Sequence, residues 1–455
     1  MTFTSLVFLV RFLPAALLLY FICPSVIRNW LLILLSILFY AWGDVTGTAV
    51  LASVTLLGYL FGRVLSGSEG KKRTIMLASG LICVIGCLLV FKYTGFVSGI
   101  LSGLGVPISR IDLPSIPGIS FFSFTVAAYL IDVYRGDTEV CLNVSDYLLY
   151  VLFFPKLLMG PITRFPDLSG QIHDHSVTSE DLEDGALLFV KGLAKKVILA
   201  DGISGLWEEV RGIGFSSASS LLCWAGIAAF SLEIYFDFSG YSDMALGLGR
   251  FFGFSLPENF HTPYSSVSIT EFWRRWHITM GQWFRDYVYI PLGGNRCSRL
   301  RNLLNLLAVW LLTGLWHGAA LNFILWGFYY FLILALERLF LHGFLEKNRL
   351  FGHIYTVFVT LIGWALFAVD DLSSLPLLMT RLFGGTGGIS AFYYLRNYAA
   401  ISVICLLLCT EQAESLWNRI TQRRSVRTLL TLILLALSIA YIIGSTYHPF
   451  MYAQF

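Results

Sequence analysis

Charged residues are scarce in this sequence. Asp, Glu, Lys and Arg make up 13% of the 455 residues, and 56% are hydrophobic, whereas a soluble protein carries roughly 25% charged residues. This shortage excludes an ordinary soluble protein. Apolar runs close to the roughly 20 residues that cross a bilayer recur from residue 4 to residue 445, and several are too short to span unaided. We therefore expect an all-α polytopic integral membrane protein with about 11 transmembrane helices and further re-entrant or amphipathic helices.

Cysteine motifs and a large excess of one charge are also absent. The eight cysteines lie mostly inside apolar runs, and the closely spaced ones have no histidine nearby. Small buried hydrophobic residues explain them, so we expect neither a disulfide nor a metal site. The net charge of +3 gives no indication of nucleic-acid binding. His173 and His175 lie among carboxylates in the polar connection 164–184, where a solvated loop is favoured over a metal site.

Long linkers and internal repeats are missing too. We therefore treat residues 1–455 as a single membrane domain, with 230–330 as its catalytic core region. From Glu233 to Arg301 the long apolar runs stop, and charged residues mix densely with aromatic ones. Irregular or amphipathic backbone at membrane depth is tolerated only where protein or a water-filled cavity surrounds it. This stretch is where a polytopic protein would build its site.

The positions of the basic residues predict the orientation. Arg63, Lys71, Lys72 and Arg73 cluster around one short loop, which the positive-inside rule places on the cytoplasmic side. Three spans precede that loop, so the N-terminus is expected on the extracytoplasmic side. The first apolar run lacks a basic leading segment and is followed by further spans, so it is interpreted as an uncleaved first helix.

His317 lies at the end of the apolar run Leu303–Trp316, in the motif Gly314–Gly318. An ionisable side chain is costly at such a depth, which makes it a candidate functional residue. Imidazole is also the side chain best suited to move protons near neutral pH. A neutral core histidine bonded to a neighbouring carbonyl is the alternative interpretation.

A second histidine belongs to an aromatic and basic segment. A capping box at Ser268–Glu271 predicts a helix that continues to Asp286. At 3.6 residues per turn, one face of that helix presents Trp273, His277, Met280 and Phe284. An interfacial amphipathic helix explains the tryptophans and arginines, but it does not explain an imidazole on the buried face. We therefore expect His277 to point into the protein.

Three carboxylates precede this segment. Glu233, Asp237 and Asp243 lie in an aromatic-rich stretch, where each needs a partner. Arg274 and Arg275 are the expected partners. A structural ion-pair network and a substrate-contacting role both remain open for them.

Several short motifs are distributed along the chain. They are FFPK (153–156), GPI (160–162), YFDFSGYSDM (235–244), LPENF (256–260), FWRRWH (272–277), YIPLGGNR (289–296), GLWHG (314–318) and PFMYAQF (449–455). Together they resemble the membrane-bound O-acyltransferase family, and its bacterial polysaccharide O-acetylation branch in particular, typified by the membrane subunit of alginate O-acetylation. The resemblance runs from the first span to the last residue.

The resemblance implies a bundle of tilted helices around a tunnel that crosses the membrane. His317 would be the essential histidine of the family, and His277 would occupy its second polar catalytic position. The residues expected along the substrate tunnel are Trp273, Arg274, Trp276, Asp237, Ser239, Asn295 and Trp316.

Relatives in this branch pass an acyl group from a cytosolic thioester to an acceptor outside. The resemblance thus implies a bacterial inner-membrane enzyme with no tightly bound cofactor, whose donor is acetyl-coenzyme A or an acyl carrier thioester. The expected partners are membrane lipid, an exported acetyltransferase of the SGNH type or a related one, and a polysaccharide acceptor such as alginate. Peptidoglycan O-acetylation and teichoic-acid D-alanylation use similar membrane subunits, so both are alternative functions for this chain.

Acyl transfer to a hydroxyl needs a base for its proton and support for the oxyanion. We expect His317 to be the base and His277 to orient the donor or stabilise the intermediate. No Ser, Cys or Lys lies in a recognisable nucleophile motif, which favours direct transfer over a covalent acyl-enzyme. A proton-coupled transporter or flippase and a non-catalytic scaffold are the alternatives of other classes; the absence of inverted repeats disfavours the former.

Overall fold

The structure of the chain is a computed structural model that describes residues 1–174, 176–369, 371–384, 387–444 and 449–451. His175 and the last four residues of the C-terminal motif lie outside the described residues. Helices account for 77% of the structure. In the part of the chain that is described, extended pairing is limited to two isolated β-bridges. The all-α class predicted from the apolar runs is confirmed.

Six of the described helices are long and apolar enough to cross a membrane, and a bent pair makes a seventh. They are α3 (Val45–Ser66), α4 (Gly70–Gly103), α11 (Ser220–Phe251), α15 with η6 (Leu321–Leu341), α17 (Arg349–Ala368), α21 (Arg424–Gly444), and the pair α19 (Phe392–Leu408) and α20 (Glu411–Thr421). The polytopic character is confirmed, but the continuous long spans are fewer than the roughly 11 expected from run length.

Breaks inside the apolar runs explain this difference. The run 145–160 contains Pro155, and the structure divides it into α6 (Val144–Leu152) and α7 (Phe154–Leu157). Proline lacks an amide proton and clashes with the preceding turn, so it interrupts a helix. The first two apolar runs of the sequence also form helices that are shorter than a full span, Phe8–Ile22 and Ser25–Ala41.

The described chain divides into two compact units. Unit 1 comprises Met1–Phe189 and Tyr241–Pro257, and unit 2 comprises Val190–Gly240 and Glu258–Phe455. The expectation of a single domain stays a prediction.

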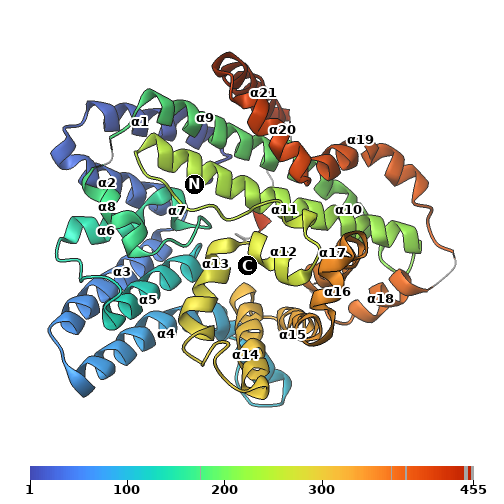
Figure 1. Cartoon of the computed structure of the whole chain (residues 1–455), viewed down its shortest axis with the longest axis horizontal. Helices are drawn as coiled ribbons and strands as arrows, with labels where there is room; N and C mark the ends of the chain where they lie inside the picture. The colour runs from blue at the N-terminus through green and yellow to red at the C-terminus, as the bar shows by residue number, and fades with distance from the viewer. Residues whose placement is uncertain (175, 370, 385–386, 445–448, 452–455) are drawn as a thin grey trace. The chain divides into compact units, whose positions relative to one another are not determined.

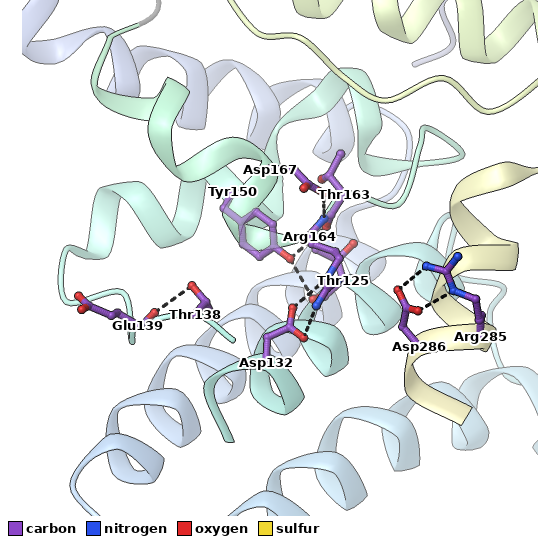
Figure 2. A network of polar contacts seen from close by, with 10 residues as sticks. All are labelled: Thr125, Asp132, Thr138, Glu139, Tyr150, Thr163, Arg164, Asp167, Arg285 and Asp286. Atoms are coloured by element: carbon purple, nitrogen blue, oxygen red, sulfur yellow. Dashed lines mark hydrogen bonds and ion pairs between the residues drawn. The ribbon is translucent and has the colours of Figure 1, made fainter. Parts of the chain in front are cut away.

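Unit 1 contains a polar network around the buried carboxylate of Asp132. Arg164 donates to both carboxylate oxygens of Asp132 at 2.9 and 3.2 Å, and its backbone amide donates to Asp167. Figure 2 shows this network. Bidentate guanidinium–carboxylate pairs are among the stronger hydrogen-bonded contacts, so this pair ties the segment before α8 to α5.

The helices of unit 1 not yet given are η1 (Phe8–Phe12), α1 (Leu13–Ile22), η2 (Ser25–Ile27), α2 (Arg28–Ala41), α5 (Ile119–Arg135) and α8 (Phe165–His173); α9 (Ser179–Ala194) and α11 contribute residues to both units.

Unit 2 holds both candidate histidines. Its central feature is the hairpin of α14 (Arg299–His317) and α15 (Leu321–Leu336), seen in Figure 1. A Cβ atom on Gly314 would lie 2.3 Å from the carbonyl oxygen of Phe323, and one on Gly327 would lie 2.3 Å from that of Trp310. Only glycine permits such close approach. The other helices of unit 2 are η3 (Lys195–Ala200), α10 (Asp201–Ile213), η4 (Pro263–Ser265), α12 (Ile269–Arg275), α13 (Ile278–Phe284), η5 (Arg285–Tyr289), η6 (Glu337–Leu341), α16 (His342–Lys347) and α18 (Leu375–Phe383).

The single helix predicted from Ser268 to Asp286 is wrong. The structure breaks it between α12 and α13, where His277 has the left-handed φ of 45°. The cause is a segment from earlier in the chain: Phe260 forms an antiparallel bridge with Trp276, and the Ile278 amide donates to the Asn259 carbonyl at 3.0 Å. These backbone bonds replace the helical ones.

Candidate active site

Aromatic rings surround the His317 imidazole at the C-terminal end of α14. The ring centroids of Trp326 and Phe367 lie 5.0 and 5.2 Å away, both edge-on, and Phe323 stacks at 6.5 Å. The residue is 3% exposed. The position at the end of an apolar run, which the sequence showed, therefore places the imidazole inside an apolar aromatic pocket.

His277 is fully buried and also lies among aromatic rings. Its imidazole meets Phe238 of α11 edge-on at 4.7 Å and stacks on Phe260 at 6.5 Å. The inward direction predicted for His277 is confirmed, although its cause is different. The chain turns through a left-handed residue, a conformation that is uncommon outside glycine and often found at functional sites.

Trp316 joins the two histidines into one cluster. Its indole lies 5.7 Å from the His277 ring and 5.0 Å from the His317 ring, centroid to centroid. Trp316 is 6% exposed. Two imidazoles 40 positions apart in the sequence therefore contact one buried indole.

Asn259 determines the proton position on His277. Its side-chain oxygen Oδ1 accepts from the Thr279 amide at 3.1 Å and from the Thr279 hydroxyl at 3.0 Å. A backbone amide can only donate, so the Asn259 atom is an oxygen. Nδ1 of His277 lies 3.1 Å from the same oxygen and must donate to it. The proton is on Nδ1, and the lone pair is on Nε2.

Burial has a second effect on His277. The residue lies between α12 and α13, outside the long apolar helices, and burial lowers its pKa from 6.5 to about 3. Desolvation penalises the charged imidazolium relative to the neutral ring. His277 is therefore a neutral imidazole whose Nε2 can accept a hydrogen bond or a proton.

Sequence reasoning did not single out Asn259. It belongs to the LPENF motif, which carried the resemblance but showed no spacing to His277. The two residues meet only because the backbone pairing of the Phe260 segment brings them together. An Asn shortly after an apolar run was the one available signal.

The two tryptophans of the FWRRWH motif pack against rings that contact the histidines. Trp273 packs on Trp310 at 5.0 Å and on Trp326 at 5.5 Å, and Trp326 in turn contacts His317. Trp276 is buried and packs on Phe260 at 5.1 Å. Both tryptophans thus extend the aromatic wall around the histidines.

Asp237 is buried one residue before Phe238, and its partner is not the one expected. Lys196 lies 2.6 Å from its carboxylate and 2.7 Å from that of Asp201. The amide of Met451 donates to Asp237 at 3.0 Å. The prediction that Arg274 or Arg275 pairs with Asp237 is wrong.

The two arginines lie elsewhere. Arg275 pairs with Glu271 at 2.6 Å and with Glu411, and Arg274 is exposed. Lys196 was missed because Lys191 and Lys195 stand in the same apolar run, and the sequence gives no indication of which lysine meets which carboxylate. A lysine inside such a run is itself the signal.

The remaining predicted tunnel residues have different surroundings. Ser239 is 1% exposed, like Asp237. Asn295 is exposed, and its side-chain oxygen accepts from Tyr289 and Arg338. The structure therefore brings Trp273, Trp276 and Trp316 to the histidine cluster, and leaves Arg274 and Asn295 on the surface.

Comparison with known proteins addresses the family. The sequence pattern of the membrane-bound O-acyltransferase family matches residues 140–364. The protein named probable alginate O-acetylase AlgI of Azotobacter vinelandii is 39% identical over 82% of this chain and 76% of its own length. Its counterpart in Pseudomonas aeruginosa is also 39% identical, over 82% of this chain and 73% of its own. The peptidoglycan O-acetyltransferase of Helicobacter pylori is 29% identical over 100% of this chain and 97% of its own length.

The chain belongs to the membrane-bound O-acyltransferase family. It is a multi-pass membrane enzyme that transfers acyl groups to oxygen, and the resemblance seen in its motifs is confirmed.

The histidine cluster of this acyltransferase lies within the matched residues. A neutral imidazole held by an Asn and a second imidazole in an aromatic pocket, each in contact with Trp316, offer two groups that can exchange protons away from water. Proton transfer by positioned imidazoles is a common part of acyl-transfer chemistry. The aromatic walls would exclude water, which competes with a hydroxyl acceptor for the acyl group.

Proposed function

We propose that this acyltransferase moves an acetyl group from a thioester donor on the cytosolic side to a hydroxyl on the extracytoplasmic side. The observation that carries the proposal is the contact of both buried histidines with Trp316. The named activities of the alginate and peptidoglycan relatives support acetyl as the group and a polysaccharide as the final acceptor.

His317 acts as the general base in this proposal. It takes the proton of the acceptor hydroxyl while the hydroxyl oxygen attacks the thioester carbonyl. The tetrahedral intermediate then collapses, the carbon–sulfur bond breaks, and the departing thiolate receives the proton. The ester product and the free thiol account for all atoms, and no covalent acyl-enzyme is formed.

His277 orients the donor. Its Nε2 lone pair suits a hydrogen bond from an N–H or O–H group of the substrate, because Nδ1–H is committed to Asn259. Both coenzyme A and a carrier protein present their thioester on a phosphopantetheine arm, which has amide N–H groups. Either donor therefore fits this role.

The acceptor is either the polysaccharide itself or an exported acetyltransferase of the SGNH type that passes the group on. Alginate-type exopolysaccharide is the first choice, because the alginate relatives are 39% identical. Peptidoglycan is the second candidate, favoured by the coverage of the whole chain in the Helicobacter pylori comparison. A teichoic acid D-alanyltransferase of Bacillus subtilis is 28% identical over 50% of the chain, which supports D-alanylation less.

The proposed location is the bacterial inner membrane, with the N-terminus on the extracytoplasmic side. The exposed basic residues Lys71 and Lys72, at the start of α4, support this orientation through the positive-inside rule. A cysteine introduced near the N-terminus and labelled from one side of the membrane tests it.

The deciding experiment is acetyl transfer by the purified protein in nanodiscs, with radiolabelled acetyl-coenzyme A and an alginate oligosaccharide. We expect His317→Ala to lower turnover by about 10²–10⁴-fold, with donor binding retained. His261→Ala is the matched control, because that side chain is 56% exposed. Full turnover in His317→Ala would refute the assignment of the base, and thioester consumption by neither wild type nor variants would favour a carrier-protein donor, a transporter or a scaffold.

A further inference from the structure

The corner formed by α19, α20 and α21 has the geometry of a helix lying in the membrane interface. α20 bends by 79° from α19, and α21, which follows it, is long and apolar enough to cross a membrane. Figure 1 shows α20 between these two helices. A helix that turns by nearly a right angle from the apolar helix before it, and that leads into a helix long enough to cross the bilayer, has the geometry of one that runs along the membrane surface.

The sequence of α20 suits that position. Ala413, Leu416, Trp417 and Ile420 follow the spacing of one helix face. Leu416 is 57% exposed and Ile420 is 37% exposed. Apolar side chains exposed along one face of an interfacial helix insert at the boundary between headgroups and acyl chains.

Basic residues concentrate at the end of this helix. Four arginines occur between residues 419 and 427, with no acidic residue among them: Arg419, Arg423, Arg424 and Arg427. Arg419 and Arg423 are exposed, and neither forms an ion pair with any residue that the structure describes. Their charge is therefore available to a ligand.

The nearby carboxylates have contacts of their own, and one of them is paired with a cation. Glu411 is bound by Arg275, whose hydrogen bond and charge lower the pKa of that carboxyl below its usual range. Glu414 lies 3.8 Å from His261. Each arginine of a cluster at the end of an interfacial helix raises the affinity for anionic lipid about fivefold.

We propose that this corner is a binding site for anionic phospholipid headgroups. Arg419 and Arg423 bind the phosphate, and Leu416 and Ile420 contact the start of the acyl chains. An open groove of about 320 Å³ along α20 is lined by Glu411, Gln412, Ser415, Leu416 and Arg419. It therefore combines an apolar side chain with a cation, as the two parts of a phospholipid require. The site is independent of the acyl-transfer chemistry proposed above.

The test measures retained lipid on the purified full chain by native mass spectrometry. Phosphatidylglycerol and phosphatidylcholine are offered in equal amounts, for wild type, for R419Q/R423Q, and for the control K71Q/K72Q. The control removes an equally exposed pair of cations at the start of another span, α4. Thermal unfolding of all three proteins checks that the exposed substitutions leave the fold intact.

We expect wild type and K71Q/K72Q to prefer phosphatidylglycerol, and R419Q/R423Q to lose about thirtyfold in its affinity for that lipid. Retained preference in R419Q/R423Q, or an equal loss in both variants, would overturn the proposal. Displacement of the lipid by inorganic phosphate alone would also overturn it, because that result would indicate a site for free phosphate.

Discussion

The side-chain oxygen of Asn259 lies 3.1 Å from Nδ1 of His277 and receives a hydrogen bond from it. The same oxygen also accepts from the amide and the hydroxyl of Thr279. These three contacts fix the ring orientation and the tautomer of a residue that the backbone holds in a left-handed conformation. The direction of the Nε2 lone pair is therefore set before any substrate binds.

Asn259→Asp should change the pH dependence of the enzyme. The carboxylate can still accept all three hydrogen bonds, but a negative charge beside His277 raises the pKa of the imidazole. We expect a further acidic limb in the pH profile of kcat/KM, in addition to any that the base His317 gives, because His277 then becomes protonated as the pH falls.

Asn259→Leu is the companion variant. It leaves the buried Thr279 amide without its acceptor, which costs about 1–3 kcal/mol of stability. The decisive readout is the pH profile of Asn259→Asp. If Asn259 had only a structural role, Asn259→Asp and Asn259→Leu would have the same pH profile.

His277 should remain neutral across the physiological range. Burial lowers its pKa from 6.5 to about 3, so the folded protein binds no proton there between pH 5 and 8. The unfolded chain takes up that proton below about pH 6.5. The contribution of His277 to stability is therefore fully present above that pH and decreases as the pH falls.

Ring ¹⁵N resonances of histidine in the detergent-solubilised protein test this directly, with His277→Asn to identify the signal. The pair of signals should show a protonated Nδ1 and an unprotonated Nε2, unchanged from pH 5 to 8. A midpoint near 6.5 would contradict the buried, neutral state.

Lys196→Met should strongly destabilise the protein. The substitution leaves the buried Asp237 carboxylate without its cation at 2.6 Å, and breaking a buried pair in this way costs about 3–5 kcal/mol. Replacing both residues, as Lys196→Met with Asp237→Leu, should recover much of the loss. Thermal unfolding of the single and double variants in detergent measures the loss of stability. Equal stability of wild type and Lys196→Met would show that the ion pair contributes little.

Gly327→Val should displace the end of α14. Its Cβ would lie 2.3 Å from the Trp310 carbonyl oxygen, so the α14–α15 hairpin must open and His317 must move. We expect lower thermal stability together with a loss of acetyl transfer. Gly343→Val is the matched control, because nothing lies within 4 Å of its added Cβ; similar losses in both variants would mean that the hairpin contact has no special role.

Much of this architecture could be predicted from the amino-acid pattern. The shortage of charge and the recurring apolar runs require a helical membrane protein, because backbone polar groups in lipid must bond within their own segment. The burial of His317 follows from its place at the end of such a run. The inward direction of His277 was also predicted, from its apolar neighbours at helical spacing, although a left-handed turn is what produces it.

The helix through His277 was predicted incorrectly for a definite reason. Periodicity describes local preference, and residues 268–286 have the pattern of a continuous helix. A bridge from Phe260 takes over the backbone bonding at Trp276 and turns His277 into a left-handed residue. Pairing between two separate segments leaves no periodic pattern of residues from which it could be predicted.

Composition and apolar spacing by themselves determined that this chain is a polytopic helical membrane protein with two histidines at buried positions. Only the tertiary structure decided that both histidines contact Trp316, that Asn259 sets the tautomer of one, and that Lys196 rather than an arginine neutralises Asp237. The physical reason is the separation along the sequence between the residues that determine each property. Burial depends on each segment's own hydrophobicity, whereas a hydrogen-bond or charge partner depends on which distant segment the packing brings within about 3 Å.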